Sequence, residues 1–365
     1  MVSNFRFAIA SDLHIALPHT IRDIPQRFHL VEFSIRALEV AFQHLEQLDL
    51  DFLLLPGDLT QDGEPDNHRW LQQRLAALPF PVCVVPGNHD ILQAKATQNA
   101  IGCTEFPRYY QQFGYQNTEK LYYTCEIFPG VQLIALNSNQ FDEQGKQLGY
   151  GLLDEEQLTW LEQVLVEQRD RVVLVMVHHN AIAHLPGQAT HPLGRRYAIE
   201  NSAQLLAILK KYNVKLLLTG HLHVQDIAER DGIHEITTGS LVSYPHPYRV
   251  LEFDGEQQTL KIKSYRVAQI PGYEDLPGFS REFLAERSAP LMAKLATLPP
   301  LELPLIEAEQ IAANLRYFWA DVAAGDALFD FPRFSPEVRQ FFEAFGVERK
   351  DGIPALIDNQ TTLPL

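Results

Sequence analysis

The sequence predicts an α/β protein with two sheets flanked by helices, followed by a mainly α-helical C-terminal extension. Short apolar runs typical of buried strands alternate with helical patterns up to about residue 219. Strand patterns separated by Asp-Gly turns continue to about residue 266, and Pro-Gly pairs then mark a linker. We therefore expect a main domain at residues 1–268 and a helical extension at residues 269–365.

The elements are expected in the following order. Apolar strands are predicted at residues 5–10, 52–55, 82–85, 122–128, 131–136, 172–177 and 214–219. Helices are predicted between them at residues 28–48, 67–78, 106–113, 154–167 and 202–212. Asp154 and Gln157 resemble a capping box at the start of one helix.

After about residue 220, the alternation of strands and helices gives way first to strands alone and then to helices. Four strands between residues 224 and 266 are expected to form one antiparallel meander, with turns at Asp231-Gly232 and Asp254-Gly255. In the extension, helices are expected at residues 280–298 and 306–321, and Ser335-Pro336 begins another. The tail after Phe345 is expected to be loosely ordered.

Composition excludes several classes of protein. A net charge of −16 repels nucleic-acid phosphates, so we expect no nucleic-acid partner. The three cysteines, Cys83, Cys103 and Cys125, give no disulfide framework and fit a reducing compartment. No apolar run approaches the roughly 20 residues of a membrane span, and no signal peptide is evident. We therefore expect a cytoplasmic protein without a membrane partner.

Residues that can bind metals follow five of the predicted strands. They are Asp12 and His14, Asp58, Asn88 with His89 and Asp90, His178 with His179, and His221 with His223. Sites in α/β sheets collect at the carboxyl ends of strands, and alternate residues of an extended segment face one side. A single residue of this kind is usually an ordinary surface or packed side chain. Five strand ends that all carry such residues, in this order, predict a shared metal site, and we propose that Asp58 bridges two ions in it.

The chemistry of these side chains limits the metal. Imidazoles and carboxylates without thiolates suit Mn, Fe, Zn or Co. Most of the remaining histidines are expected to pack or to face solvent; they are His19, His29, His44, His68, His184, His191, His234 and His246.

The motifs resemble those of the calcineurin-like metallophosphoesterase superfamily over about residues 5–266. They are Asp12-Leu13-His14, Gly57-Asp58, Gly87-Asn88-His89-Asp90, His178, and Gly220-His221-Leu222-His223. The segments at residues 57–63 and 87–90 are most similar to the class III cyclic-nucleotide phosphodiesterase branch. The resemblance implies a four-layer metallophosphoesterase-like sandwich with a dinuclear metal centre.

The same resemblance implies roles for individual residues. One ion would take Asp12, His14, Asp58 and His223; the other would take Asp58, Asn88, His178 and His221. His89 would act near the leaving-group oxygen, and Asp90 would orient it. His178 directly follows its strand and is taken as the ligand, whereas His179 would face the substrate or pack.

The expected activity is hydrolysis of small phosphodiesters by a hydroxide generated between two divalent or trivalent ions. Among the candidate substrates, 3′,5′-cyclic nucleotides are the first choice. The alternatives are another phosphoesterase, such as a phosphomonoesterase, or a catalytically silent metal-binding scaffold.

Substrate selection stays open at this stage. Arg195 and Arg196 would contact phosphate or face solvent, and Tyr244, His246 and Tyr248 would stack on a base or pack. The extension would pack on the core, make a homodimer contact or cover the cleft.

Overall fold

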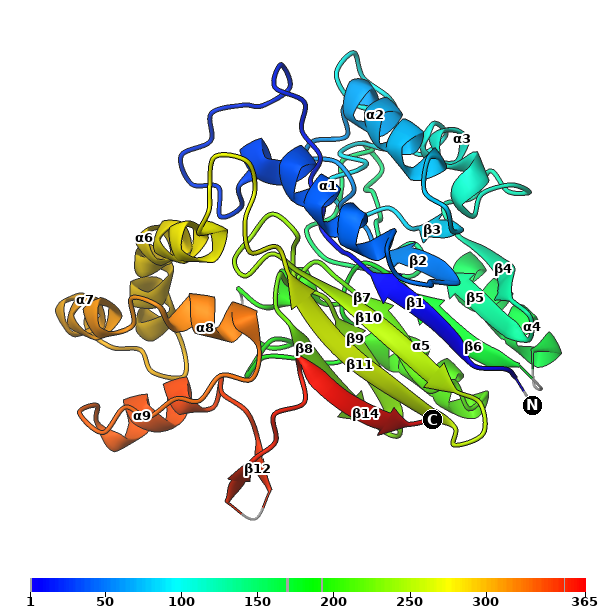
Figure 1. The fold of residues 1–365 in the computed structure, drawn as a ribbon. Helices are drawn as coiled ribbons and strands as arrows, with labels where there is room; N and C mark the ends of the chain where they lie inside the picture. The colour runs from blue at the N-terminus through cyan, green and yellow to red at the C-terminus, as the bar shows by residue number, and fades with distance from the viewer. Residues whose placement is uncertain (1, 169–170, 192, 351) are drawn as a thin grey trace.

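Two sheets lie face to face in this computed structural model, which describes residues 2–168, 171–191, 193–350 and 352–365 (Figure 1). The first runs from edge to edge as β14 (Gln360–Pro364), β11 (Thr259–Arg266), β10 (Pro247–Asp254), β1 (Phe5–Ile9), β2 (Phe52–Leu55) and β3 (Val82–Val84). β1, β2 and β3 are parallel, and the other three pair antiparallel. Parallel strands covered on both faces read as continuous apolar runs, which is why residues 53–55 are all leucine and fully buried.

The second sheet has the order β4 (Tyr123–Phe128), β5 (Val131–Ala135), β6 (Val172–Met176), β7 (Leu216–Thr219), β9 (Ile233–Thr237) and β8 (Asp226–Arg230). Its four central strands are parallel, with β4 and β8 antiparallel at the edges. Apolar side chains of the two sheets form one core, in which Phe7 and Leu251 are packed with Leu174 and Leu218.

Helices cover the outer faces and complete the four layers. α1 (Ser34–Leu45) and α2 (Pro65–Ala76) pack on the first sheet through residues such as Phe42 and Leu71. α4 (Glu155–Glu167) and α5 (Ser202–Lys211) pack on the second sheet through leucines. The predicted cap is confirmed, since the Asp154 carboxylate accepts a 2.7 Å hydrogen bond from the Gln157 backbone. The two-sheet sandwich predicted from the sequence is thus confirmed.

Shorter helices lie in the loops between these elements. They are α3 (Phe106–Tyr109) and the 3-10 helices η1 (Val31–Phe33), η2 (Gln111–Phe113) and η3 (Arg195–Tyr197).

The expected single meander is wrong, because its two hairpins join different sheets. β8 and β9 extend the second sheet, where β9 pairs with β7, whereas β10 pairs with β1 in the first sheet. The Asp231-Gly232 turn is nevertheless correct, and both residues have positive φ, as a tight hairpin turn requires. Local sequence therefore indicated the hairpins but not their partners.

The extension forms a helical group to one side of the sheets (Figure 1). It contains α6 (Leu276–Thr297), α7 (Leu305–Asn314), α8 (Phe318–Ala324), α9 (Pro336–Glu343) and a hairpin of β12 (Arg349–Lys350) and β13 (Ile353–Pro354). Its apolar cluster, which includes Met292, Phe318 and Phe342, also contains Leu222 and Val224 of the main domain. The extension therefore packs on the segment that carries His221 and His223.

The loosely ordered tail is another expectation that fails. β14 pairs with β11, and Leu363 lies opposite Leu260 with 6% of its surface exposed. The chain thus returns from the helices to the first sheet. A boundary at residue 268 stays a prediction.

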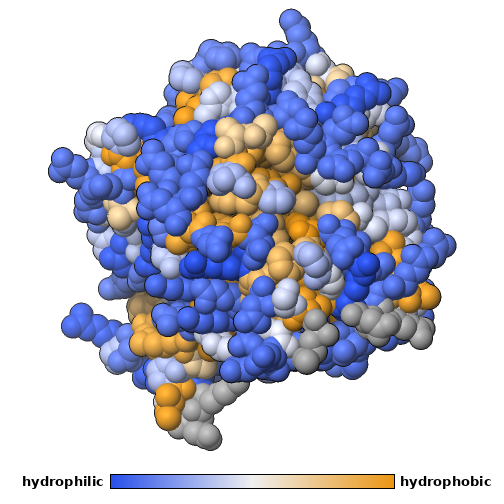
Figure 2. All heavy atoms as spheres, turned by 45° about the vertical axis from the view of Figure 1, so that its right-hand side comes forward, coloured by the Kyte–Doolittle hydropathy of each residue, from blue (hydrophilic) through white to orange (hydrophobic). Residues whose placement is uncertain are grey.

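One face of the molecule is mostly hydrophilic. Figure 2 shows that hydrophilic residues cover most of this face, with apolar residues gathered near its middle and in smaller groups toward its edges. Among the described helices, none is long and apolar enough to span a bilayer.

Candidate metal centre

Backbone hydrogen bonds join the loops after β1 and β2, and the loop after β7 is joined to them by the His221 backbone, which donates to the Asp12 carboxylate. Asp12 and His14 donate from their backbone nitrogens to the carbonyls of Gly57 and Asp58, at 3.2 and 2.9 Å. Two glycines permit this close approach. A Cβ at Gly87 would lie 2.2 Å from Asp58 Oδ1, and one at Gly220 would lie 2.0 Å from Ser11 Oγ. The sequence thus folds these loops into one compact site.

Most of the expected ligands lie on backbone that is not extended. Positive φ angles occur at Asp12 (51°), His14 (42°), Asp58 (49°), His221 (67°) and His223 (57°). The expectation that alternation along a strand aims these side chains is therefore wrong. Left-handed residues turn the chain sharply after each strand and direct the side chains into one space.

The first group of candidate ligands is Asp12, His14, Asp58 and His223. One possible ligand atom from each lies within 4.8 Å of all the others. His14 Nε2 is 3.3 Å from His223 Nε2 and 3.6 Å from Asp58 Oδ2, and His223 Nε2 is 3.1 Å from Asp12 Oδ1. Converging nitrogens and carboxylate oxygens in a buried place fit a cation.

The second group contains Asp58, His178 and His221, whose candidate atoms also lie within 4.8 Å of one another. His178 Nε2 is 3.3 Å from Asp58 Oδ1 and 3.1 Å from Asn88 Oδ1. The two oxygens of Asp58 therefore face different groups. The seven candidate ligands predicted from the sequence lie in two groups that share one carboxylate, and each group is called a half-site below.

Backbone carbonyls orient the histidines of the second group. His178 Nδ1 donates to Pro56 O at 2.8 Å, and His221 Nε2 donates to Arg196 O at 3.1 Å. Because a carbonyl can only accept, the nitrogen that donates to it carries a proton, and the other nitrogen of each ring is the one that can bind a metal once it is unprotonated. His14 differs, since its Nδ1 is buried without a hydrogen-bond partner among the described residues.

Burial and neighbouring charges set the protonation of the group. Burial lowers the pKa of His221 to about 3, and burial together with His29 lowers the pKa of His14. Both rings are therefore neutral, which is the form that coordinates metals. Burial also acts to lower the pKa of His178, but Asp58 outweighs it and raises that pKa to about 9. Binding of a cation in the second group would release this proton.

His89 lies beside both groups, but Asp90 does not orient it as expected. Among the described residues, the Asp90 carboxylate accepts hydrogen bonds from Gly87, Leu59 and Thr60. His89 Nδ1 instead donates to the carbonyl of Gln61 at 2.6 Å. Asp90 thus holds the loops after β2 and β3 together, and its burial and the nearby Asp58 raise its pKa to about 7.

His29 lies with these residues, although no sequence motif pointed to it. Its ring stacks on that of His14 with centroids 4.2 Å apart, and a nitrogen of each of His14, His29 and His223 lies in one 4.8 Å group. His29 Nε2 is 2.9 Å from Gln61 Oε1. His29 lies in the long loop between β1 and η1, far from any strand end, so no local motif could identify it.

Other candidates from the sequence take structural roles. His179 is buried, and its Nδ1 lies 2.8 Å from Ser138 Oγ, so it packs behind His221. His246 is fully buried and donates to Leu241 O, and the Tyr248 hydroxyl lies 2.9 Å from His44 Nδ1. Stacking of His246 or Tyr248 on a base is therefore not supported.

The two neighbouring arginines are not equivalent. Arg195 is paired with Glu200 at 2.7 Å, whereas the Arg196 guanidinium lies over the Tyr197 ring, 4.6 Å from its centroid.

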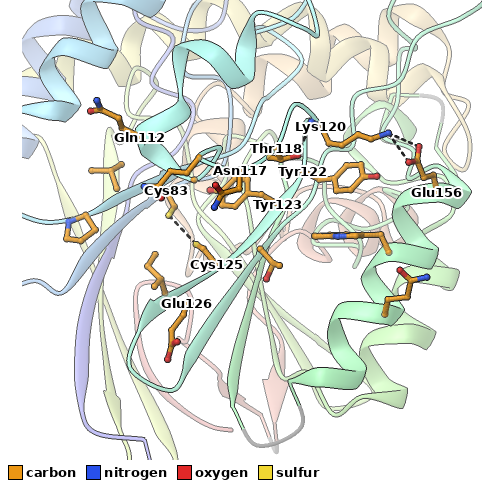
Figure 3. A pocket seen from close by; sticks show the side chains of 18 of the residues that line it. Cys83, Gln112, Asn117, Thr118, Lys120, Tyr122, Tyr123, Cys125, Glu126 and Glu156 are labelled. Carbon is orange, nitrogen blue, oxygen red and sulfur yellow. Dashed lines mark hydrogen bonds and ion pairs between the residues drawn. The ribbon is translucent and has the colours of Figure 1, made fainter.

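A cavity of about 960 Å³ lies away from these residues, between β3, β4 and α4 (Figure 3). Cys83 and Cys125 line this cavity, and their sulfur atoms lie 4.0 Å apart. Lys120 also lines it and is paired with Glu156 (Figure 3). None of the candidate ligands lines this cavity. This cavity, although large, is therefore not part of the candidate metal centre.

Known proteins resemble this chain in sequence and fold. The family model described as calcineurin-like phosphoesterase matches residues 5–225. A 3′,5′-cyclic-nucleotide phosphodiesterase of Nostoc is 27% identical over 264 residues, covering 72% of this chain and 82% of the relative. The 3′,5′-cyclic adenosine monophosphate phosphodiesterase CpdA of Escherichia coli is 27% identical over 53% of this chain and 62% of its own.

Two further proteins widen the comparison. A probable glycerophosphodiester phosphodiesterase GpdQ of Arcobacter nitrofigilis is 29% identical over 47% of this chain and 56% of its own. In fold, the chain is similar to a dimetal phosphatase from Danio rerio, with a TM-score of 0.54 and 15% identity over 72% of this chain and 96% of that structure.

Proposed function

This chain belongs to the calcineurin-like phosphoesterase family and is a metal-dependent hydrolase, and we propose that it cleaves small phosphodiesters at a dinuclear centre. The observation that carries the proposal is Asp58, whose two carboxylate oxygens face two separate groups of ligands. Diester substrates are favoured because relatives named for cyclic-nucleotide and glycerophosphodiester hydrolysis are similar to this chain.

The proposed ligands follow the two groups described above. Asp12, His14, Asp58 and His223 would hold one ion, and Asp58, Asn88, His178 and His221 would hold the other. Manganese, iron, zinc and cobalt all suit this set. When bound, two such ions polarise phosphoryl oxygens and lower the pKa of water so that hydroxide is available near neutral pH.

The protein itself would orient the diester and supply a proton. The Asn88 amide and His89 lie next to the shared Asp58, and the His89 backbone donates to Asp58 Oδ1 at 2.8 Å. Because His89 Nδ1 is held by the Gln61 carbonyl, Nε2 is the atom left to protonate the leaving oxygen. Asp90 would contribute by holding the loop on which His89 lies.

A substrate panel tests the proposal. Purified protein would be stripped with a chelator, reloaded with Mn²⁺, and assayed on bis(p-nitrophenyl) phosphate, p-nitrophenyl phosphate, and 3′,5′- and 2′,3′-cyclic AMP. We expect diester turnover that disappears on chelation and returns with Mn²⁺. Faster turnover of the monoester would instead identify a phosphomonoesterase. Two bound ions without turnover of any substrate would identify a silent scaffold.

Location and assembly complete the proposal. We infer a cytoplasmic protein that forms a homodimer, to be checked by cell fractionation and by the molar mass in solution.

A further inference from the structure

A second cavity, of about 740 Å³, lies between the loop segments at residues 185–191 and 193–197 and the helical extension. The loop contributes Leu185 and Leu193, and the extension contributes Leu291, Trp319 and Phe341. Its walls are therefore mostly hydrocarbon, and its volume lies in the range of small-molecule sites.

Several polar groups in the wall are already engaged within the protein. Gln188 accepts hydrogen bonds from the backbones of His184 and Leu185 and donates to Asn180. Thr190 Oγ1 donates to the Gly187 carbonyl, and His191 Nδ1 accepts from the Leu193 backbone. Arg196 Nη2 donates to the Tyr197 hydroxyl. The side-chain polar groups of the described wall that remain for a ligand are therefore few: His191 Nε2, the Trp319 indole N–H and the rest of the Arg196 guanidinium. A nucleobase would leave hydrogen-bonding edges without partners here, whereas a hydrocarbon chain would not.

The wall of this cavity is shared with the metal centre. Leu222, which lines the cavity, stands between the candidate ligands His221 and His223. Arg196 and Tyr197 also line it; the Arg196 carbonyl orients His221, and the Tyr197 ring lies 5.1 Å from the His221 ring. A group bound at the second half-site would therefore lie next to the cavity.

We propose that this cavity holds a hydrocarbon chain of the substrate, so that the preferred substrates are alkyl or monoacyl phosphodiesters. This inference rests on the proposed function, because it places the phosphate of the same diester at the metal centre. It gives the extension a role in substrate selection, since Leu291, Trp319 and Phe341 belong to it.

A homologous series of substrates tests the proposal. Methyl, butyl and octyl 4-nitrophenyl phosphate would be assayed with the Mn²⁺-loaded protein below the critical micelle concentration of the octyl ester. Since each buried methylene favours binding, kcat/KM should rise roughly 10- to 100-fold from methyl to octyl, mainly through KM. A flat series with normal methyl ester turnover would refute the cavity assignment. A kcat/KM for 3′,5′-cyclic AMP above that of the octyl ester would also refute it.

Matched variants localise the effect. Leu291→Gln introduces an amide into the cavity wall and should remove most of the octyl advantage while leaving the methyl ester unchanged. Leu305→Gln makes the same change on α7 at a side chain that is 62% exposed, and should change neither substrate. Leu193→Gln repeats the test from the loop side, in case α6 tolerates no amide. Equal octyl preference in all these proteins would overturn the proposal.

A binding measurement keeps the test independent of catalysis. Octylphosphonate, which cannot be hydrolysed to an alcohol, should change the fluorescence of Trp319 in the cavity, and methylphosphonate should not. The change should vanish in Trp319→Phe, since the other tryptophans, Trp70 and Trp160, do not line this cavity. Absence of any diester turnover would refute the proposed function, while the fluorescence titration would still decide whether the cavity binds an alkyl chain.

Discussion

The strand ends of the main domain and the helical extension are built on opposite principles. At the strand ends, buried polar side chains are fixed by backbone groups: His178 donates to the Pro56 carbonyl, and Asp12 accepts from the His221 backbone N–H. The extension instead packs through aromatic and aliphatic side chains such as Phe318 and Phe342. The first region depends on the exact position of single atoms, and the second on volume and shape. Substitutions should therefore affect chemistry in one region and stability in the other.

The largest effect is expected at Asp58. Asp58→Asn removes the charge that both half-sites share, so both ions should be lost and diester hydrolysis should fall by about 10³-fold or more. Metal content by mass spectrometry and turnover of bis(p-nitrophenyl) phosphate measure the two losses. Asp49→Asn, at an exposed carboxylate, is the matched control. Two tightly bound ions in the Asp58→Asn variant would contradict the claim that both half-sites depend on the Asp58 carboxylate.

His89 comes next. His89→Ala should retain both ions but lower hydrolysis of a diester with a poor leaving group by roughly 10²- to 10⁴-fold, because the proton donor is lost. A nitrophenyl diester, whose leaving group needs no proton, should lose much less. The ratio of the two rates is the measurement, with His19→Ala at a side chain 64% exposed as control. Equal losses for both substrates would contradict the acid role.

The extension should respond in stability. Phe342 is fully buried, with its ring centroid 5.3 Å from that of Phe318. Phe342→Ala should lower the free energy of unfolding by about 3–5 kcal/mol, measured by urea denaturation. Metal content and methyl ester turnover per folded molecule should not change. Leu328→Ala, at a side chain 56% exposed, should have little effect on either. Loss of metal in Phe342→Ala would show that the two regions are not separable.

The last prediction concerns the pH dependence of stability, and it rests on the buried His184. Its side chain is 0% exposed, with Nδ1 2.6 Å from Asp226 and Nε2 3.2 Å from Glu235. Burial acts to lower the pKa of His184, but the two carboxylates outweigh it and raise the pKa to about 10. The folded pKa lies above the unfolded value of about 6.5, so the stabilisation is complete below pH 6.5 and declines from there to pH 10.

Urea denaturation at several pH values in that window would show this decline. His184→Gln should flatten it, and His19→Gln should not. An unchanged pH dependence in His184→Gln would assign the decline to other groups.

Sequence reasoning succeeded where a motif and a strand end coincide. That Asp58 and His221 lie close together was predictable, because each follows an apolar run that forms a strand of one of the two packed sheets. His29 was missed because a loop between β1 and η1 brings it to the site, and loop paths depend on tertiary contacts. The partner of the His89 ring was also missed, since the Gln61 carbonyl is a backbone atom that no side-chain pattern reveals.

The limits in the fold have the same origin. Hairpins were predictable from turn residues, but the sheet that each joins is decided by pairing with β7 or β1. The position of the extension was not predictable, because its apolar spacing indicates helices without indicating what they cover. The extension packs on Leu222 of the main domain, and this contact exists only once the main domain has folded.

The left-handed backbone at Asp12, His14, Asp58, His221 and His223 has a consequence for heat resistance. Each such residue costs about 1 kcal/mol or more relative to glycine, which adopts this conformation freely. Glycine at these positions would relieve the backbone but remove the carboxylate or imidazole. Selection or engineering for a more thermostable protein therefore meets five positions that it cannot change to glycine without removing a proposed metal ligand. Gains in melting temperature must come from elsewhere in the chain.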